Sequence, residues 1–167
     1  MKIAFTADIH ADTFSDFAKD VVVYWDSLEG RFIEDSDGDR VISSRYLDIL
    51  KALCDIRDYC ITNKVNFLFV AGDTFHKRGI LKVAVIVPLQ MVFESFEDNG
   101  IQVVLVGGNH DYDSKSSNLT PYASIECFRG VVSRVILAPE IVEIEDTFIG
   151  GVLMWLAFPG MRIGKNI

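Results

Sequence analysis

The sequence predicts an α/β fold in which a parallel sheet belongs to a four-layer α/β/β/α sandwich. Three apolar runs rich in β-branched and aromatic residues, at 2–7, 65–70 and 101–106, are typical of buried parallel strands. A helical pattern precedes the second and the third of these runs, as a βαβ unit requires. Further apolar runs after residue 130 predict the start of a second sheet, the other inner layer of the sandwich.

The first strand is expected at the centre of a doubly wound sheet. The segment that follows it carries little helical pattern, and Val21–Trp25 fits either a strand or a short helix. The acidic run 34–39 separates 31–33 from 40–42 and predicts a hairpin that turns at its Asp-Gly pair. Because this run has the wrong spacing for an EF-hand calcium loop, it is interpreted as a solvated turn.

Two helices and several later elements follow in order. Ser43 or Ser44 caps a helix through about Asn63, with apolar residues at three-to-four spacing. A second helix runs from about Lys82 to Asn99, with Pro88 marking a kink or a later start. Beyond the third strand the pattern predicts one short helix and three strands, at 119–128, 131–137, 141–144 and 148–158.

Composition limits the class of protein. At 167 residues, half of them hydrophobic, the chain is long enough to bury a core and is expected to form one domain, residues 1–167. A net charge of −8 argues against a generally basic surface, so any DNA affinity would come from a local patch, bound metal ions or a partner chain. Three cysteines, two of them expected in the core (Cys54, Cys60), form no C-x-x-C pair. Without a recognisable signal peptide or membrane span, the protein is expected to be cytoplasmic.

Polar side chains follow each of the three predicted strands. Asp8 and His10 come after the first strand, Asp73 after the second, and Asn109–Asp111 after the third. Because ligands bind beyond the carboxyl ends of the strands in open α/β sheets, these side chains are expected to form one metal site. The mixture of carboxylate, imidazole and amide ligands favours Mn²⁺, with Fe²⁺, Zn²⁺ or Mg²⁺ as alternatives.

These three motifs, in this order, resemble those of the calcineurin-like metallophosphoesterases: Asp8-x-His10, Gly72-Asp73 and the GNHD stretch 108–111. The extension of the second motif to Gly-Asp-Thr-Phe-His is similar to the SbcD-like DNA-repair nuclease branch, as are Arg45 and Asp48. This resemblance implies metal-dependent phosphodiester hydrolysis on DNA, by a nuclease subunit acting in repair, recombination or replication. It also implies an SbcC-like coiled-coil ATPase as partner, and a homodimer is left open.

The resemblance also implies roles for the motif residues. Asp8 and His10 would bind a first metal ion, Asp73 would bridge both ions, and Asn109 would bind the second. Two such ions, roughly 3.5 to 4 Å apart, acidify a water and neutralise the phosphate. His110 would protonate the leaving oxygen, while Asp111 or another carboxylate holds its tautomer.

The loop after Asp73 carries candidate substrate-binding residues. His76 is expected to shape the site, and Lys77 and Arg78 are candidates for contacts with a nucleic-acid backbone. Exposed loop residues without a role are the alternative for all three.

The pattern departs from the family in its histidines. Family members carry further histidines downstream that complete both metal sites, whereas none follows Asp111 here. We therefore expect the N-terminal part of the sandwich, from a fragment, from a split gene of the kind found in phage genomes, or from a degenerate copy. A general phosphatase and a non-catalytic remnant that binds metal or a partner are the alternative functions.

Overall fold

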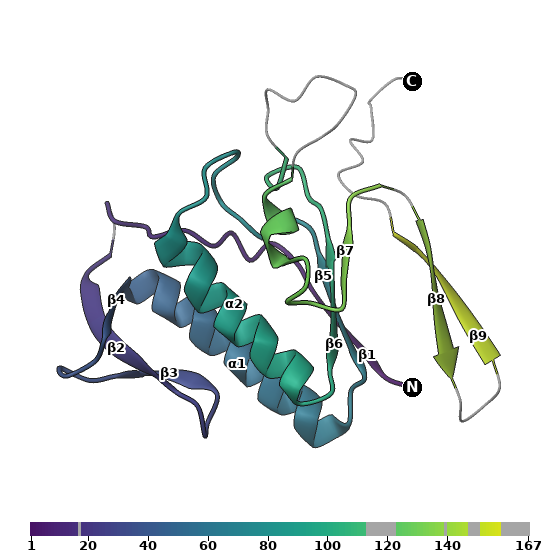
Figure 1. The fold of residues 1–167 in the computed structure, drawn as a ribbon, viewed down its shortest axis with the longest axis horizontal. Helices are drawn as coiled ribbons and strands as arrows, with labels where there is room; N and C mark the ends of the chain where they lie inside the picture. The colour runs from purple at the N-terminus through teal and green to yellow at the C-terminus, as the bar shows by residue number, and fades with distance from the viewer. Residues whose placement is uncertain (17, 113–122, 139, 147–150, 158–167) are drawn as a thin grey trace.

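The computed structural model describes residues 1–16, 18–112, 123–138, 140–146 and 151–157 (Figure 1). Its centre is a parallel sheet in which the order of strands follows the order of the chain. The four strands are β1 (Ile3–Thr6), β5 (Phe67–Ala71), β6 (Gln102–Val106) and β7 (Arg134–Ile136).

Strand β1 lies at one edge of this sheet, so its expected central position is wrong for the described strands. The reason is that each connection places the next strand on the same side of the preceding one, so the sheet grows in one direction from β1. Because such crossovers are right-handed, steps in one direction place both helices on the same face of the sheet. Helices α1 (Ser44–Asn63) and α2 (Val83–Asp98) cover that face, as Figure 1 shows.

Helix α1 begins and ends where its sequence predicts. The Ser43 hydroxyl accepts a hydrogen bond from the Tyr46 amide at 3.3 Å, which satisfies one free donor of the first turn. At the other end, Lys64 adopts a left-handed conformation, and its N–H donates to the carbonyls of Cys60 and Ile61. The buried stripe consists of Tyr46, Leu47, Leu50, Leu53, Cys54, Arg57 and Cys60, so both expected core cysteines are confirmed.

Helix α2 begins before Pro88, which excludes the later start considered for it. The proline lies inside the helix, and close to it the Tyr46 hydroxyl donates to the Val85 carbonyl at 2.5 Å. The helix ends at Asp98, where the amides of Asn99 and Gly100 donate to carbonyls of the last turn. The predicted end of the helix at about Asn99 is confirmed.

A second, three-stranded sheet packs on the outside of α1, so the helices lie between two sheets (Figure 1). Its long central strand is β2 (Asp20–Asp26), with β3 (Arg31–Glu34) on one side and β4 (Arg40–Ser43) on the other. The predicted hairpin between 31–33 and 40–42 is therefore wrong, since both segments pair with β2 instead.

The acidic run between β3 and β4 explains this difference. It carries the chain across β2 rather than reversing it, and it passes so close that a Cβ on Gly38 would lie 2.4 Å from the Val23 carbonyl oxygen. The hairpin turn lies instead between β2 and β3, where the Gly30 amide donates to the Asp26 carbonyl at 2.7 Å. A seven-residue central strand offers partners to two shorter strands, one on each side.

The other face of the parallel sheet carries the start of a second inner layer. Phe69, Val104, Val106 and Ile136 form an apolar cluster there together with Val142, which is 4% exposed. Val142 belongs to β8 (Glu140–Asp146), which pairs with β9 (Gly151–Ala157) in an antiparallel hairpin. The predicted order of helices, parallel sheet and second sheet is confirmed for the described residues. The run 131–137, expected in the second sheet, was assigned wrongly, because it forms β7, which pairs in parallel with β6.

Two smaller predictions are partly tested. The short helix expected at 119–128 is a 3-10 helix, η1 (Ser124–Phe128), and residues 113–122 lie outside the described part of the chain. Within the described ranges, no helix combines the length and the apolar character needed to cross a membrane.

Candidate metal centre

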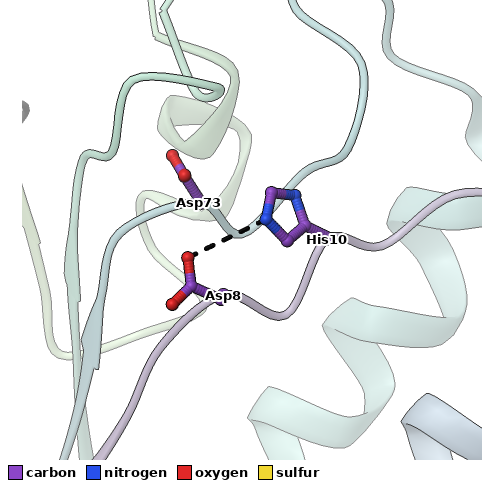
Figure 2. Close-up of side chains that lie close together, drawn as sticks. All are labelled: Asp8, His10 and Asp73. Atoms are coloured by element: carbon purple, nitrogen blue, oxygen red, sulfur yellow. Dashed lines mark ion pairs between the residues drawn. The ribbon is translucent and has the colours of Figure 1, made fainter.

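The predicted ligands meet at the carboxyl end of the parallel sheet. Asp8 and His10 lie in the loop after β1, and Asp73 lies in the loop after β5 (Figure 2). One ligand atom from each of these three residues lies within 4.8 Å of the other two. The sheet topology therefore brings together donors that are 65 positions apart in the chain.

The backbone of these loops is strained. Asp8, His10 and Asp73 have φ angles of 55°, 49° and 51°, a region that non-glycine residues rarely occupy. A strained conformation of this kind costs on the order of 1–3 kcal/mol and persists only where surrounding contacts fix it. Strain at three neighbouring polar residues is typical of a functional site.

Backbone hydrogen bonds between the two loops supply that fixation. The amides of Asp8, His10 and Ala11 donate to the carbonyls of Gly72, Asp73 and Thr74, at 3.2, 2.9 and 2.9 Å. These bonds extend the pairing of β1 with β5 beyond the ends of both strands. The two loops therefore form one unit that holds the three side chains in place.

Two glycines are required by close approach of the loops. A Cβ on Gly108 would lie 2.1 Å from the Asp73 amide nitrogen and 2.2 Å from its Oδ1. Gly72 has a φ of +92°, and a Cβ there would lie 3.0 Å from the Gly108 Cα. The loops after β5 and β6 touch only because both positions lack a side chain.

The donor set fits a divalent metal ion. His10 Nε2 lies 3.8 Å from Asp8 Oδ1, too far for a hydrogen bond but close to the separation of two ligands on one ion, roughly 3 to 4 Å. His10 Nδ1 is buried without a hydrogen-bond partner among the described residues. Because the two ring nitrogens point in different directions, Nε2 is the atom that faces Asp8 and is available as a metal ligand there.

His110 joins this cluster through both its backbone and its ring. Its amide donates to Asp73 Oδ1 at 2.8 Å, and its Nδ1 lies 2.8 Å from the His76 carbonyl oxygen. Because a carbonyl oxygen only accepts, Nδ1 carries a proton and donates to it. The ring centroid lies 4.9 Å from that of His10 and 6.2 Å from that of His76, so all three histidines of the chain meet here.

Asp111 lies elsewhere than expected. Its fully buried carboxylate accepts hydrogen bonds from the amides of Thr74, Phe75 and Gly108, at 3.2, 3.0 and 2.9 Å. Burial raises the pKa of this carboxyl, although the three amides act in the opposite direction. The group that contacts His110 Nδ1 is the His76 carbonyl, which therefore fixes the tautomer of that ring. Asp111 instead holds together the loops after β5 and β6 through their backbone amides.

Asn109 contacts both the bridging candidate and a basic residue. Its hydrogen-bonding surroundings assign the amide so that Nδ2 donates to Asp73 Oδ2 at 3.2 Å and Oδ1 accepts from Arg78 Nη2 at 2.6 Å. Arg78, expected only to bind substrate, therefore also determines how the Asn109 amide is oriented.

Lys77 forms an ion pair with a buried carboxylate, which the sequence did not indicate. Its Nζ lies 3.1 Å from Asp12 Oδ2, and Lys82 Nζ lies 3.4 Å from Asp12 Oδ1. Burial raises the pKa of Asp12, but the amide of Thr13 and the two lysines outweigh it, so the pKa lies below its usual value. Asp12 follows His10 by two residues, and this proximity was the only signal for it.

Phe14 is a second residue that sequence reasoning missed. Its ring lies 5.8 Å from that of His76, and its backbone has a φ of 50°. The guanidinium of Arg45 lies over the Phe14 ring, 4.7 Å from its centroid, which is a favourable cation–π contact. Arg45 thus supports the wall of the site, whereas Asp48 is an exposed residue of α1.

Carboxylate, imidazole and amide donors lie at three strand ends of a parallel α/β sheet and form a candidate metal-binding site. The family model for calcineurin-like phosphoesterases matches residues 1–151 of the 167, and the chain belongs to that family. Membership implies hydrolysis of phosphoesters with divalent metal ions, and the candidate ligands Asp8, His10 and Asp73 agree with it.

Proposed function

We propose that this chain is a metal-dependent phosphodiesterase that acts on DNA, as a nuclease subunit in repair, recombination or replication. The observation that carries the proposal is the convergence of all three histidines and two aspartates on one sheet edge, beside a loop that carries Lys77 and Arg78. With a net charge of −8, such a local basic loop is one source of DNA affinity, beside bound metal ions and a partner chain.

The proposed metal ligands are those that the family resemblance implies, and the grouping of Asp8, His10 and Asp73 supports them. Asp8 and His10 would hold a first ion, Asp73 both ions, and Asn109 the second. We propose Mn²⁺, with Fe²⁺, Zn²⁺ or Mg²⁺ as alternatives, because the ligands are mixed oxygen and nitrogen donors. Bound ions would lower the pKa of a water and neutralise charge on the phosphoryl oxygens.

His110 is the proposed general acid. Its Nδ1–H donates to the His76 carbonyl, which fixes the ring, and no described residue hydrogen-bonds its Nε2. A proton on Nε2 can therefore pass to the oxygen that leaves when the phosphodiester is cleaved. Asp111 is proposed to position the loops that carry His110 and Asp73, rather than to take part in proton transfer.

The substrate class rests on the loop after Asp73. His76 packs against His10 and His110, and it continues the Gly-Asp motif in the same way as the nuclease branch does. Arg78 reaches the metal ligand Asn109, and half of the Lys77 side chain is exposed despite its pairing. DNA is thus the proposed substrate, and an SbcC-like coiled-coil ATPase the proposed partner.

The test is Mn²⁺-dependent hydrolysis of linear double-stranded DNA, of a small phosphodiester and of a small phosphomonoester by this chain. We expect cleavage of both diesters in preference to the monoester. His110→Ala should lower the rate by roughly 10²- to 10⁴-fold, and Asp73→Ala should abolish it.

Two other results would each support one of the alternative functions. A preference for the monoester would indicate a general phosphatase. Metal binding without hydrolysis above the Asp73→Ala control would leave a non-catalytic binding domain.

A further inference from the structure

Asn109 offers a metal ion one oxygen, and that oxygen is already in use. Its Oδ1 accepts from Arg78 Nη2 at 2.6 Å, while its Nδ2 points toward Asp73 Oδ2 at 3.2 Å. An amide nitrogen carries two protons and no available lone pair, so only the oxygen serves as a metal ligand. The side that faces the bridging candidate Asp73 is therefore the side that does not bind metal.

Turning the amide over does not remove the conflict. The Oδ1 atom would then face Asp73, but the NH₂ group would face the guanidinium of Arg78, and both groups only donate. Two donors held at such a distance repel each other and leave both without an acceptor. Arg78 must therefore leave Asn109 when Oδ1 turns toward Asp73.

We propose that Arg78 and the second metal ion compete for Asn109 Oδ1, so that binding of this ion releases the guanidinium to hold a phosphate oxygen of the substrate. The inference rests on the proposed function, since it requires a second ion beside Asp73. It makes the basic residue available only when the metal centre is complete. Metal and phosphate would then bind in that order.

Arg78 is suited to this role and its neighbour is not. Its planar guanidinium matches both an amide oxygen and a phosphate. Lys77 is instead held by the buried carboxylate of Asp12, at 3.1 Å. Of these two adjacent basic residues, one is tied to the scaffold and the other to a proposed metal ligand.

The first experiment is a titration of the folded chain with Mn²⁺ alone, in which binding is measured by calorimetry and by electron paramagnetic resonance. In the wild type we expect a tighter and a weaker site. Arg78→Met should tighten the weaker site by roughly ten-fold, because a charge-assisted hydrogen bond no longer has to be broken. The control, Arg129→Met, removes a surface arginine that is paired with Glu126 and lies outside the site, and it should leave the weaker site within about two-fold.

A second pair of variants separates competition from simple loss of charge. Asn109→Asp supplies two oxygens, so the guanidinium and the ion no longer need the same atom. In that background, Arg78→Met should not tighten the weaker site. If it tightens that site as much as in the wild type, the effect is general electrostatics and the competition is refuted.

The last experiment tests whether the released guanidinium binds phosphate, by measuring the affinity for inorganic phosphate. Phosphate should bind the Mn²⁺-loaded wild type roughly ten-fold more tightly than Mn²⁺-loaded Arg78→Met. Equal phosphate affinity would overturn the inference, as would an unchanged weaker site in Arg78→Met. Absence of any Mn²⁺ binding in the wild type would instead refute the proposed function on which the inference rests.

Discussion

Two polar clusters of this molecule differ in how completely their buried polar atoms are hydrogen-bonded. The first surrounds Arg57 of α1, which is 3% exposed. Its guanidinium donates to the carbonyls of Glu29 and Gly30, to the Ser95 hydroxyl at 3.0 Å, and to Asp58 at 2.6 and 2.9 Å. Every nitrogen of this buried cation has a partner, which is what a structural charge requires.

The second cluster is the candidate metal centre. Three buried side-chain atoms of the described residues lack a partner, and two of them, His10 Nδ1 and Thr74 Oγ1, lie in its loops; the third is Arg40 Nε. The same loops carry most of the strained non-glycine residues. Loss of hydrogen bonds and backbone strain both lower stability, so their coincidence marks a site that is built to bind.

The largest effect is expected at the structural cluster. Arg57→Met should lower the free energy of unfolding by about 3 kcal/mol, because it takes the guanidinium from two backbone carbonyls and leaves Asp58 with Arg31 alone as its arginine partner among the described residues. Chemical denaturation measures this loss. Arg129→Met, at a surface arginine that pairs with Glu126 among the described residues, is the control and should change stability by less than about 0.5 kcal/mol. Equal effects of the two substitutions would refute the structural role of the Arg57 cluster.

A smaller loss is expected where the site is fastened to the scaffold. Asp111→Asn should destabilise the fold by about 2 kcal/mol, since one amide oxygen replaces two carboxylate oxygens that accept three N–H groups. It should also weaken Mn²⁺ binding, because the loops that carry Asp73 and His110 loosen. Asp55→Asn, at an exposed carboxylate on α1, provides the comparison. Full stability in Asp111→Asn would mean that these amides do not depend on the carboxylate.

The smallest effect depends on pH. The folded state lowers the pKa of Asp12, so its contribution is present above the unfolded value near 3.8 and is lost as pH falls through the lower folded value. Asp12→Asn should therefore cost about 1 kcal/mol at pH 7, with a difference from wild type that shrinks below pH 4. Thermal unfolding of both proteins across this range measures it. A constant difference would contradict the ion pairs with Lys77 and Lys82.

The sequence predicted those elements whose signals are local. The limits of α1 follow from its Ser43 cap and its apolar stripe, and the three strands that deliver the site follow from their β-branched runs. The hairpin at 31–42 failed because strand pairing is decided by partners distant in the chain. Nothing within those residues indicates that β2 lies between them.

For the candidate site, too, the sequence predicted the features with local signals and not the contacts between distant segments. The residue types after each strand predicted that Asp8, His10, Asp73 and Asn109 would meet, and the described geometry brings them together. Which groups they contact was not predictable, because those contacts cross between loops. Asp111 illustrates this, since its three partners are backbone amides that carry no residue-specific signal.

The most direct test of the metal centre is the shift in unfolding temperature on addition of Mn²⁺, compared between wild type and Asp73→Ala. A ligand at about 100 times its Kd stabilises a protein by about 2.7 kcal/mol, which for a domain of this size raises Tm by roughly 5 to 10 °C. We predict this shift in the wild type and none in Asp73→Ala, which removes the shared ligand. An equal shift in both proteins would contradict a metal site at the ends of β1, β5 and β6.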